Sequence, residues 1–562
     1  MYHKVHCPKC GNVMYANELA FDFGKLIDKA LEKAKNRKFG SSDEWYILTQ
    51  VNLCLYLTLE DLKQDYNFIK MSDGRYSGTF LFDSKKLADQ LVRLTKRVNT
   101  NIQILANSQG VEYDRLTRFM ALNKGEDAEE LAEKIQQIAS MCVRNPNGLI
   151  VQFDVEVSME EDDQGNYFAN SLMVTYDDDD QEKVSQFVCQ GHKRIPCGNP
   201  LYGHAGRYKE VIIGLAGTAR VGKTAYLAAL LASIMRKSDG ETKLGFEQSV
   251  LVNIAYKGED FDRFQNDILE PYVIGQKIQK TEEKGESIPL FSLTFKINGK
   301  RNFIFTFIDM PGEVYDKKDS DEGASFVLNS REIIRHASMI WLCITPSQIK
   351  GEEMVATSDR VNMKFEEALT NIDKTMKAIN VNGKIPTAVL ITRSDEADEK
   401  SHIFYPNFNP FSKEKATGEI IEDKDERLWW VSKDGYLYYD HMKWFIQRSY
   451  RFLNTNPSLP VSIENVFGKF TPFAVAAYGF SIDNPYASNI NETRLPTPSM
   501  IEGPFLWTLA TLGIIPCFYE KNVIKETKGF LGLGKKEEEV TELVKVSGED
   551  VNILFYYPYS IE

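Results

Sequence analysis

Residues 217–224, GTARVGKT, have the types and spacing of a phosphate-binding turn. Gly217, Gly222, Lys223 and Thr224 fit the pattern G-x-x-x-x-G-K-[ST], in which glycines let backbone N–H groups turn toward phosphate oxygens. The lysine would reach the β- and γ-phosphates of a nucleoside triphosphate, and the threonine hydroxyl would ligate Mg²⁺. The predicted nucleotide-binding residues here are Gly217, Thr218, Ala219, Arg220, Val221, Gly222, Lys223, Thr224 and Ala225.

The elements on either side of this turn must present it to a nucleotide. Residues 211–216 form an apolar run typical of a strand, and apolar residues recur at helical spacing over residues 226–234. The N-terminus of such a helix adds the positive end of its dipole to a phosphate site. The alternative is an ordinary glycine-rich turn with a solvated lysine, and Arg220 could likewise be solvated rather than neutralise phosphate. The strand–turn–helix context favours the nucleotide site.

An acidic residue at the end of a second strand extends this chemistry. In FIFTFIDMPGE, Asp309 would hold Mg²⁺ through water, and the Gly312 N–H would contact the γ-phosphate. Glu313 lies where a water-orienting residue is found in many GTPases, although glutamate is an unusual choice there. The structural alternatives are a capping carboxylate at Asp309 and no catalytic role for Glu313.

A third strand ends in AVLITRSDEAD, which resembles the [NT]-K-x-D guanine-specificity motif of P-loop GTPases. The Asp395 carboxylate could accept both the N1–H and the N2–H of guanine, a pair of donors that adenine lacks on that edge. Thr392 would precede it, and Arg393 replaces the usual lysine, so that its guanidinium would stack on the base. Ala477 in FAVAAYG stands where such enzymes place a backbone N–H against guanine O6, although their serine is missing here.

The cysteines at the N-terminus suggest a metal site. Cys7 and Cys10 in VHCPKCGNV have the spacing of a zinc knuckle, and FVCQGHKRI offers Cys189 and His192 at the same spacing. Cys197 competes with His192 for the fourth place, so we expect four of these five residues to bind one structural Zn²⁺. The 178 residues between Cys10 and Cys189 imply that another unit is inserted into the zinc ribbon. The alternative is a set of unrelated reduced thiols.

Short apolar runs separated by helices and loops position these motifs. Residues 291–299 and 302–310 predict a hairpin with a turn at Asn298–Gly299, and residues 338–345, 387–395 and 471–479 predict buried parallel strands. Residues 11–188 predict a separate α/β unit, with helices at 28–37 and 128–142 and strands at 45–59, 149–159 and 167–176. The aromatic stretch 427–453 predicts a core-facing helix or a partner surface. Residues 551–559 look strand-like.

Together these residues resemble the translation-factor-like (TRAFAC) branch of P-loop GTPases, and within it the bacterial double-GTPase group of predicted conflict-system GTPases. The resemblance covers about residues 189–515 and implies bound GTP or GDP, Mg²⁺ and slow intrinsic hydrolysis, with a zinc knuckle before the P-loop. Lys223 and Asp309 are 86 residues apart, about twice the spacing in compact GTPases. Thr281 is our candidate for the magnesium-binding switch threonine, with an unrelated surface threonine as the alternative.

The predicted fold class is α/β: a doubly wound P-loop GTPase sheet plus a split zinc ribbon that carries an inserted α/β unit. The predicted domains are a first zinc knuckle at 1–10, the inserted α/β domain at 11–188, a second knuckle at 189–207, the GTPase domain at 208–520 and a β-rich extension at 521–562. The 562 residues have an ordinary apolar fraction of 43% and a charged fraction of 26%.

Composition narrows the possible partners. The formal net charge of −13 argues against broad binding to nucleic acid, and the apolar stretch at residues 505–515 is too short to span a membrane. No signal-peptide pattern opens the chain, so we expect a cytoplasmic protein. The preferred function is a GTP-dependent switch that regulates a protein partner or effector. The alternatives are an ATP-dependent P-loop NTPase, a non-hydrolysing nucleotide-bound scaffold and a zinc-ribbon nucleic-acid binder.

Overall fold

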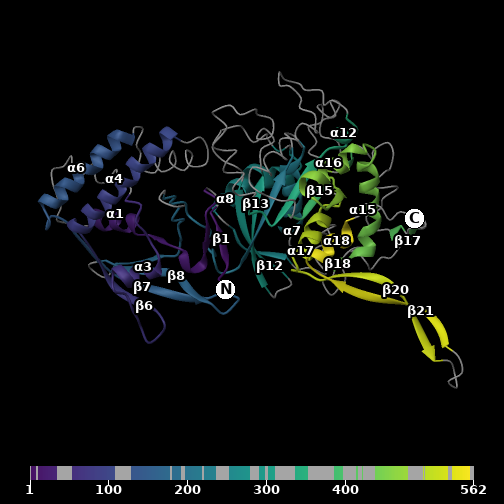
Figure 1. Ribbon diagram of the computed structural model, residues 1–562, viewed down its shortest axis with the longest axis horizontal. Helices are drawn as coiled ribbons and strands as arrows, with labels where there is room; N and C mark the ends of the chain where they lie inside the picture. Colours follow the sequence, from purple (N-terminus) through teal and green to yellow (C-terminus); the bar gives the residue numbers. More distant parts are fainter. Residues whose placement is uncertain are drawn as a thin grey trace. The chain divides into compact units, whose positions relative to one another are not determined.

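The computed structural model divides the chain into two compact units (Figure 1). Unit 1 holds the described residues up to Glu210, and unit 2 holds those from Val211 onward. Each unit has its own hydrophobic core. The structure describes residues 2–7, 10–33, 53–107, 128–176, 180–191, 196–217, 221–235, 252–257, 259–276, 278, 290–297, 301–309, 336–351, 385–395, 413–414, 420–421, 437–478, 496, 498, 500–528 and 535–556.

Unit 2 is built on a sheet of seven strands in the order β11-β12-β13-β10-β14-β15-β19. β10, β14, β15 and β19 are parallel, whereas β11, β12 and β13 form antiparallel pairs. The strand order reverses at β10, and ligands of doubly wound sheets bind at such a switch point. The strands are β10 (Lys209–Ala216), β11 (Val252–Lys257), β12 (Leu290–Ile297), β13 (Arg301–Asp309), β14 (Met339–Ile344), β15 (Thr387–Ile391) and β19 (Phe470–Ala474).

The apolar runs of the sequence become the buried strands of this sheet. β14, β15 and β19 are buried along their whole length, as expected for parallel strands covered on both faces. Trp341 of β14 is fully buried; its ring meets the edge of Tyr226, and its indole N–H donates to the Thr508 hydroxyl at 3.1 Å. The helices of unit 2 are α7 (Lys223–Met235), α8 (Glu259–Phe264), the π-helical turn η3 (Gln265–Leu269), α9 (Glu270–Val273), α12 (Pro346–Ile349), α15 (Tyr439–Leu453), α16 (Ser458–Phe467), α17 (Glu502–Thr511) and α18 (Glu549–Phe555).

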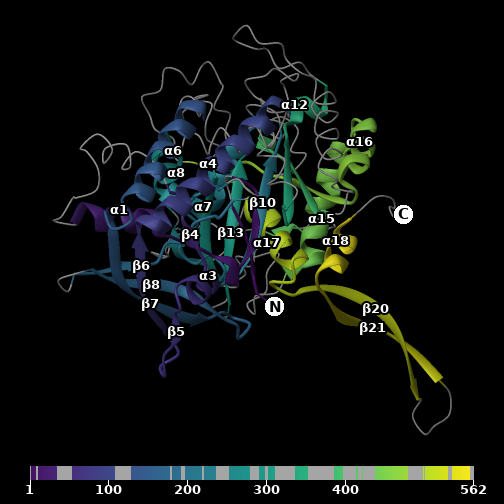
Figure 2. The same cartoon turned by 60° about the vertical axis from the view of Figure 1, so that its left-hand side comes forward.

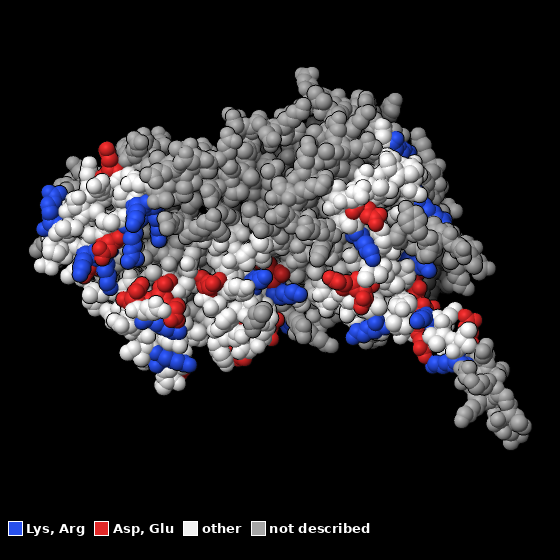
Figure 3. All heavy atoms as spheres, in the orientation of Figure 1, with Lys and Arg blue, Asp and Glu red and all other residues white. Residues whose placement is uncertain are grey.

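Beyond α17 the chain forms a two-stranded ribbon that extends away from the sheet of unit 2 in both views (Figures 1 and 2). β20 (Cys517–Lys528) pairs antiparallel with β21 (Lys535–Val546). On its other edge, β20 pairs with β18 (Leu437–Tyr438) through its first two residues only. Its described side chains are mixed in charge, as on the rest of the face in view (Figure 3), and Lys525 pairs with Glu542 at 2.6 Å. A further short pair joins β16 (Lys413–Glu414) and β17 (Ile420–Ile421).

Unit 1 contains a five-stranded antiparallel sheet in the order β5-β6-β7-β8-β9. In β7, buried and exposed residues alternate, because helices cover one face of the sheet. Phe23, Phe80 and Phe153 stack in the core beneath those helices, with neighbouring ring centroids 4.6 and 5.0 Å apart. The strands are β5 (Ile69–Lys70), β6 (Tyr76–Asp83), β7 (Ile150–Glu161), β8 (Tyr167–Thr175) and β9 (Gln181–Val184), and the helices are α1 (Phe23–Lys33), α3 (Leu59–Asp65), α4 (Ser84–Asn107) and α6 (Ala128–Arg144).

Smaller elements of unit 1 connect its N-terminal segment to this sheet. β1 (Lys4–His6) pairs antiparallel with β2 (Val13–Tyr15), and β3 (Phe21–Asp22) pairs with β4 (Tyr56–Leu57). The short helix η1 (Ala16–Glu18) lies between the two pairs. Val188 bridges both Ala20 and Pro200, so that the segment after β9 lies against the N-terminal segment. Within the described residues, no helix combines the length and apolarity needed to cross a membrane.

Two predicted strands are wrong in the described residues. Of residues 45–59, those from 53 onward contain only the two-residue β4 and the start of α3, which Thr58 and Asp61 cap reciprocally. Residues 551–555 belong to helix α18, whose first turn carries Glu549 and Asp550, acidic residues that favour a helix start. The aromatic stretch contributes α15, with Met442 and Ile446 buried, so the core-facing interpretation holds for this part. The predicted turn at Asn298–Gly299 lies outside the described residues, but β12 and β13 pair antiparallel as expected.

Candidate nucleotide site and thiol cluster

The predicted phosphate loop connects β10 to α7 at the switch point of the sheet. Gly217 has φ +141°, and a Cβ placed there would lie 2.6 Å from the Cys343 carbonyl oxygen, so only glycine fits. The Lys223 ammonium, on a buried side chain, donates to the Gly217 carbonyl at 2.9 Å. This cation therefore lies within the loop, at the N-terminus of a helix, where an anionic group would be stabilised.

The remaining residues of the loop fall in three classes. Val221 is fully buried, and Gly222 has φ +86° and accepts the N–H of Tyr226 as α7 begins. Thr224 and Ala225 are half-buried in the first turn of α7. Thr218, Ala219 and Arg220 lie outside the described residues.

The predicted base-recognition motif lies directly against this loop. Thr392 follows β15; its N–H donates to the Ile344 carbonyl at 2.9 Å, and its buried hydroxyl donates to the Val221 carbonyl. A Cβ on Gly222 would lie 3.9 Å from Cγ of Arg393, so the stem of this arginine borders the phosphate loop. Asp395 is half-buried two residues further on. The structure thus brings the 392–395 motif and the 217–224 motif together.

The loop after β19 completes this edge of the sheet. The Val475 N–H donates to the Ile391 carbonyl at 2.9 Å, and the Ser394 N–H donates to the Val475 carbonyl at 3.2 Å. Ala477 is half-buried, and its carbonyl accepts a hydrogen bond from the Tyr272 hydroxyl at 2.5 Å. Tyr272 was not a predicted site residue. A single tyrosine in a helical segment gives no sequence signal for a contact 205 residues away.

The predicted magnesium and catalytic residues are only partly described. Asp309 is the last residue of β13, the strand beside β10 in the sheet. The Asp309 side chain, and Thr281, Gly312 and Glu313 as a whole, lie outside what the structure describes.

Four cysteines of unit 1 form a compact thiol cluster. The sulfurs of Cys7, Cys10, Cys189 and Cys197 all lie within 4.8 Å of one another. Sγ of Cys7 is 3.8 Å from that of Cys197, and Sγ of Cys10 is 3.6 Å from that of Cys189. A tetrahedral ion with metal–sulfur bonds of about 2.3 Å requires sulfurs about 3.8 Å apart. The four residues therefore fit such an ion, with Cys197 as the fourth; His192, the other candidate for that place, lies outside the described residues.

The backbone around the cluster forms tight turns next to the cysteines. Gly11 and Gly198, which follow Cys10 and Cys197, have φ +68° and +65°. The Gly191 N–H points to Sγ of Cys189 at 3.3 Å. Burial is the main cause that raises the pKa of the Cys7 thiol, whereas S–H groups of Cys10 and Cys189 lower the pKa of Cys197.

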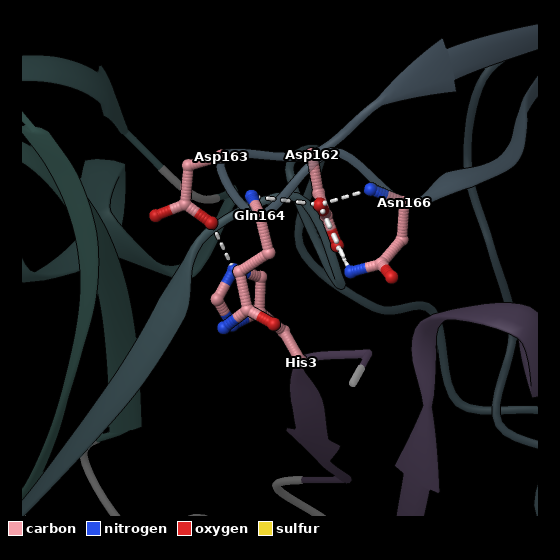
Figure 4. A network of polar contacts seen from close by, with 5 residues as sticks. All are labelled: His3, Asp162, Asp163, Gln164 and Asn166. Atoms are coloured by element: carbon pink, nitrogen blue, oxygen red, sulfur yellow. Dashed lines mark hydrogen bonds and ion pairs between the residues drawn. The ribbon is translucent and has the colours of Figure 1, made fainter.

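Polar contacts fix the segment that precedes Cys7 within unit 1. His3 bonds to Asp163 in the turn between β7 and β8, and Asp162 in the same turn accepts the backbone N–H groups of Gln164 and Asn166, each at 2.8 Å (Figure 4). On β1, the backbone N–H and Nδ1 of His6 lie 2.9 and 2.7 Å from one oxygen of the buried Glu210 carboxylate. Cys7 thus follows a strand that is fixed at both ends.

One comparison with known families covers the candidate nucleotide site. Residues 211–404 match the model of the family Double-GTPase 2. A search of the curated proteins finds no match to the chain.

Solved structures that match include GTPase domains. The G domain of the FeoB iron transporter of T. maritima is 16% identical, with 34% of this chain and 76% of that chain covered and a TM-score of 0.16. The GTPase-like domain of S. cerevisiae Ski7, bound to GTP, is 11% identical, with 60% and 58% covered and a TM-score of 0.20. The septin GTPase domain from Chlamydomonas reinhardtii is 13% identical, with 51% and 81% covered and a TM-score of 0.19.

The family match begins at the first residue of unit 2 and spans the phosphate loop, β13 and the 392–395 motif. The sheet order with its switch point at β10, and the contact between the two motifs, are what such a domain requires. Residues 211–404 of this chain, which carry both motifs, therefore match the family model Double-GTPase 2 over the part of unit 2 that forms the candidate nucleotide site.

Proposed function

We propose that this protein is a GTP-hydrolysing switch whose nucleotide state controls a protein partner or effector. The carrying observation is that the 392–395 motif lies against the phosphate loop, where the Thr392 hydroxyl donates to the Val221 carbonyl and the stem of Arg393 borders Gly222. A nucleotide whose phosphates occupy the loop at 217–224 would extend its base over the residues that follow β15. Asp395 is the carboxylate nearest in sequence to that point, and it would accept the N1–H and N2–H groups of guanine.

Different residues of the site would bind different parts of the triphosphate. The backbone N–H groups and Lys223 would hold the β- and γ-phosphates, with the ammonium exchanging the Gly217 carbonyl for a phosphate oxygen. Mg²⁺ supplies charge neutralisation between these phosphates when bound, and Thr224, Asp309 and Thr281 are the residues proposed to hold it. Gly312 and Glu313 are proposed to contact the γ-phosphate and to orient water.

The thiol cluster supports a second, structural assignment. We propose that Cys7, Cys10, Cys189 and Cys197 bind one Zn²⁺, because four buried or half-buried thiols at tetrahedral spacing leave no position for a substrate. The ion would tie the two ends of the α/β unit together. A role in a bacterial conflict system, with a protein rather than a nucleic acid as the partner, is the finer part of this proposal.

Base preference tests the proposed function. Wild type is expected to prefer GTP to ATP by about 10⁴-fold, because a site built to pair buried hydrogen-bonding groups rejects a ligand that leaves them unpaired. Asp395→Asn is expected to weaken GTP and to favour xanthosine triphosphate, whose 2-oxo group can accept a hydrogen bond from the amide. Competition binding with GTP, ATP and xanthosine triphosphate measures all three affinities.

Asp440→Asn is the matched control, since Asp440 is another partly buried aspartate of unit 2, bonded to the Glu520 N–H. This control is expected to keep the wild-type preference. Equal binding of ATP and GTP by wild type would refute the guanine assignment and favour an ATP-dependent NTPase. Single-turnover hydrolysis separates the switch from a non-hydrolysing scaffold, since a scaffold would return the bound GTP intact.

A further inference from the structure

A helical segment inserted between α7 and β12 reaches the loop after β19. Tyr272 of α9 donates its hydroxyl to the Ala477 carbonyl at 2.5 Å. The next residue, Tyr478, presents its ring edge-on to Tyr272 with centroids 5.2 Å apart, and its hydroxyl meets the backbone of Ile278. The two tyrosines therefore join this segment to the loop from both sides.

The helical segment is itself held rigidly. Phe261, Phe264 and Ile268 are buried in the core of unit 2, and the ring of Phe264 lies 4.5 Å from that of Phe291 on β12. The π-helical turn η3 connects α8 to α9 without a break in the helix. Such turns are rare and are frequently found at functional sites. Tyr272 is thus carried on a fixed element and not on a loose loop.

The hydrogen bond fixes the plane of one peptide. The described residues contain no cis peptide bond, so the N–H of Tyr478 points opposite to the Ala477 carbonyl and hence away from Tyr272. The same loop is bonded through the Val475 carbonyl to the N–H of Ser394, which belongs to the 392–395 motif that borders the phosphate loop. The base of a nucleotide bound at that loop would meet this fixed peptide.

We propose that Tyr272 is a positioning residue for the purine base, which orients the 476–478 loop so that a backbone N–H meets the 6-oxo group of guanine. The inference rests on the proposed guanine-nucleotide site. Tyr272 lies outside the 392–395 motif and the 476–478 loop. It would act on recognition of the O6 edge of the base, whereas Asp395 would accept the hydrogen bonds of the N1 and N2 edge.

Tyr272→Phe tests this inference, because it removes the hydroxyl and keeps the ring. The variant is expected to bind GTP and inosine triphosphate about 2- to 12-fold more weakly, the range expected for one net hydrogen bond. Both bases have a 6-oxo group, whereas adenine has an amino group there, so the affinity for ATP should not change. Tyr226→Phe is the matched control, since its buried hydroxyl also donates to a backbone carbonyl, that of Ile501, at 3.1 Å. This control should leave all three affinities unchanged.

The outcomes separate the inference from the function on which it rests. Equal losses for GTP, inosine triphosphate and ATP, in a wild type that prefers GTP, would show that Tyr272 only stabilises the fold and would overturn the inference alone. Unchanged affinity for all three nucleotides would overturn it as well. A wild type without preference for GTP would remove the guanine site and the inference together, and that result comes from the unmutated protein.

Discussion

Replacing Gly217 by alanine tests the phosphate loop by its steric requirement. Alanine at this position must adopt φ +141°, a region that non-glycine residues occupy at a cost of about 1–3 kcal/mol. Its Cβ would also lie 2.6 Å from the Cys343 carbonyl oxygen and 3.1 Å from a methyl of Val221. The carbonyl belongs to β14 and cannot turn aside, and overpacking of this kind costs about 1–3 kcal/mol more. We therefore expect Gly217→Ala to lower the free energy of unfolding of unit 2 by about 4 kcal/mol.

Gly222→Ala is the matched control for backbone strain. Gly222 also has a positive φ, +86°, but a Cβ there meets nothing closer than 3.8 Å. This variant should lose only the cost of the left-handed conformation, about 1–2 kcal/mol. Urea unfolding of the nucleotide-free proteins, followed by tryptophan fluorescence, measures both losses, since Trp341 and Trp507 are fully buried in unit 2. Equal losses for the two variants, or a loss below about 1 kcal/mol for Gly217→Ala, would refute the packing argument.

Two further predictions concern the thiol cluster and a buried acid. Elemental analysis after dialysis against a chelator should find about one zinc per chain in wild type and none in Cys197→Ser. Cys142→Ser is the control, because Cys142 is a buried thiol outside the cluster, and this variant should also keep about one zinc. Zinc retained by Cys197→Ser would contradict the assignment. Burial raises the pKa of Glu502, so the folded protein retains a proton that the unfolded chain releases, and stability falls as the pH rises above the ordinary glutamate value. The free energy of unfolding of Glu502→Gln should therefore increase relative to that of wild type from pH 5 to pH 8, by about 1.4 kcal/mol for each tenfold change in the acid dissociation constant. The same difference in unfolding free energy between the two proteins at pH 5 and at pH 8 would contradict this.

The phosphate loop could be predicted from sequence, because its motif lies directly between a predicted strand and a predicted helix. Gly217, Gly222 and Lys223 lie within seven consecutive residues, between an apolar run and a helical repeat, so spacing alone fixes their arrangement. The cysteines could be predicted as a set, but the sequence alone does not choose between His192 and Cys197 as the fourth ligand. Tyr272 could not be predicted, since its partner lies on a strand end formed much later in the chain.

The two incorrectly predicted strands have one local and one tertiary cause. The run that ends at Leu59 is rich in β-formers, yet Thr58 and Asp61 form a capping box and start a helix there. Residues 551–555 look like a strand by composition, but packing of Val551 and Phe555 into the core of unit 2 decides for a helix. A local capping box in the first place and tertiary packing in the second override β-propensity.

The wide separation of the thiols in the chain has a consequence for how the protein is made. Closing the loop of 186 residues between Cys10 and Cys197 costs about 4–5 kcal/mol of chain entropy in the unfolded chain, so folding of the intervening α/β unit favours assembly of the cluster. On a ribosome that adds about 5–20 residues per second, the first cysteine pair waits for about 10–40 s before its partners are synthesised. All four cysteines are therefore present only after the α/β unit has been synthesised, about when the strand that leads to the phosphate loop is made.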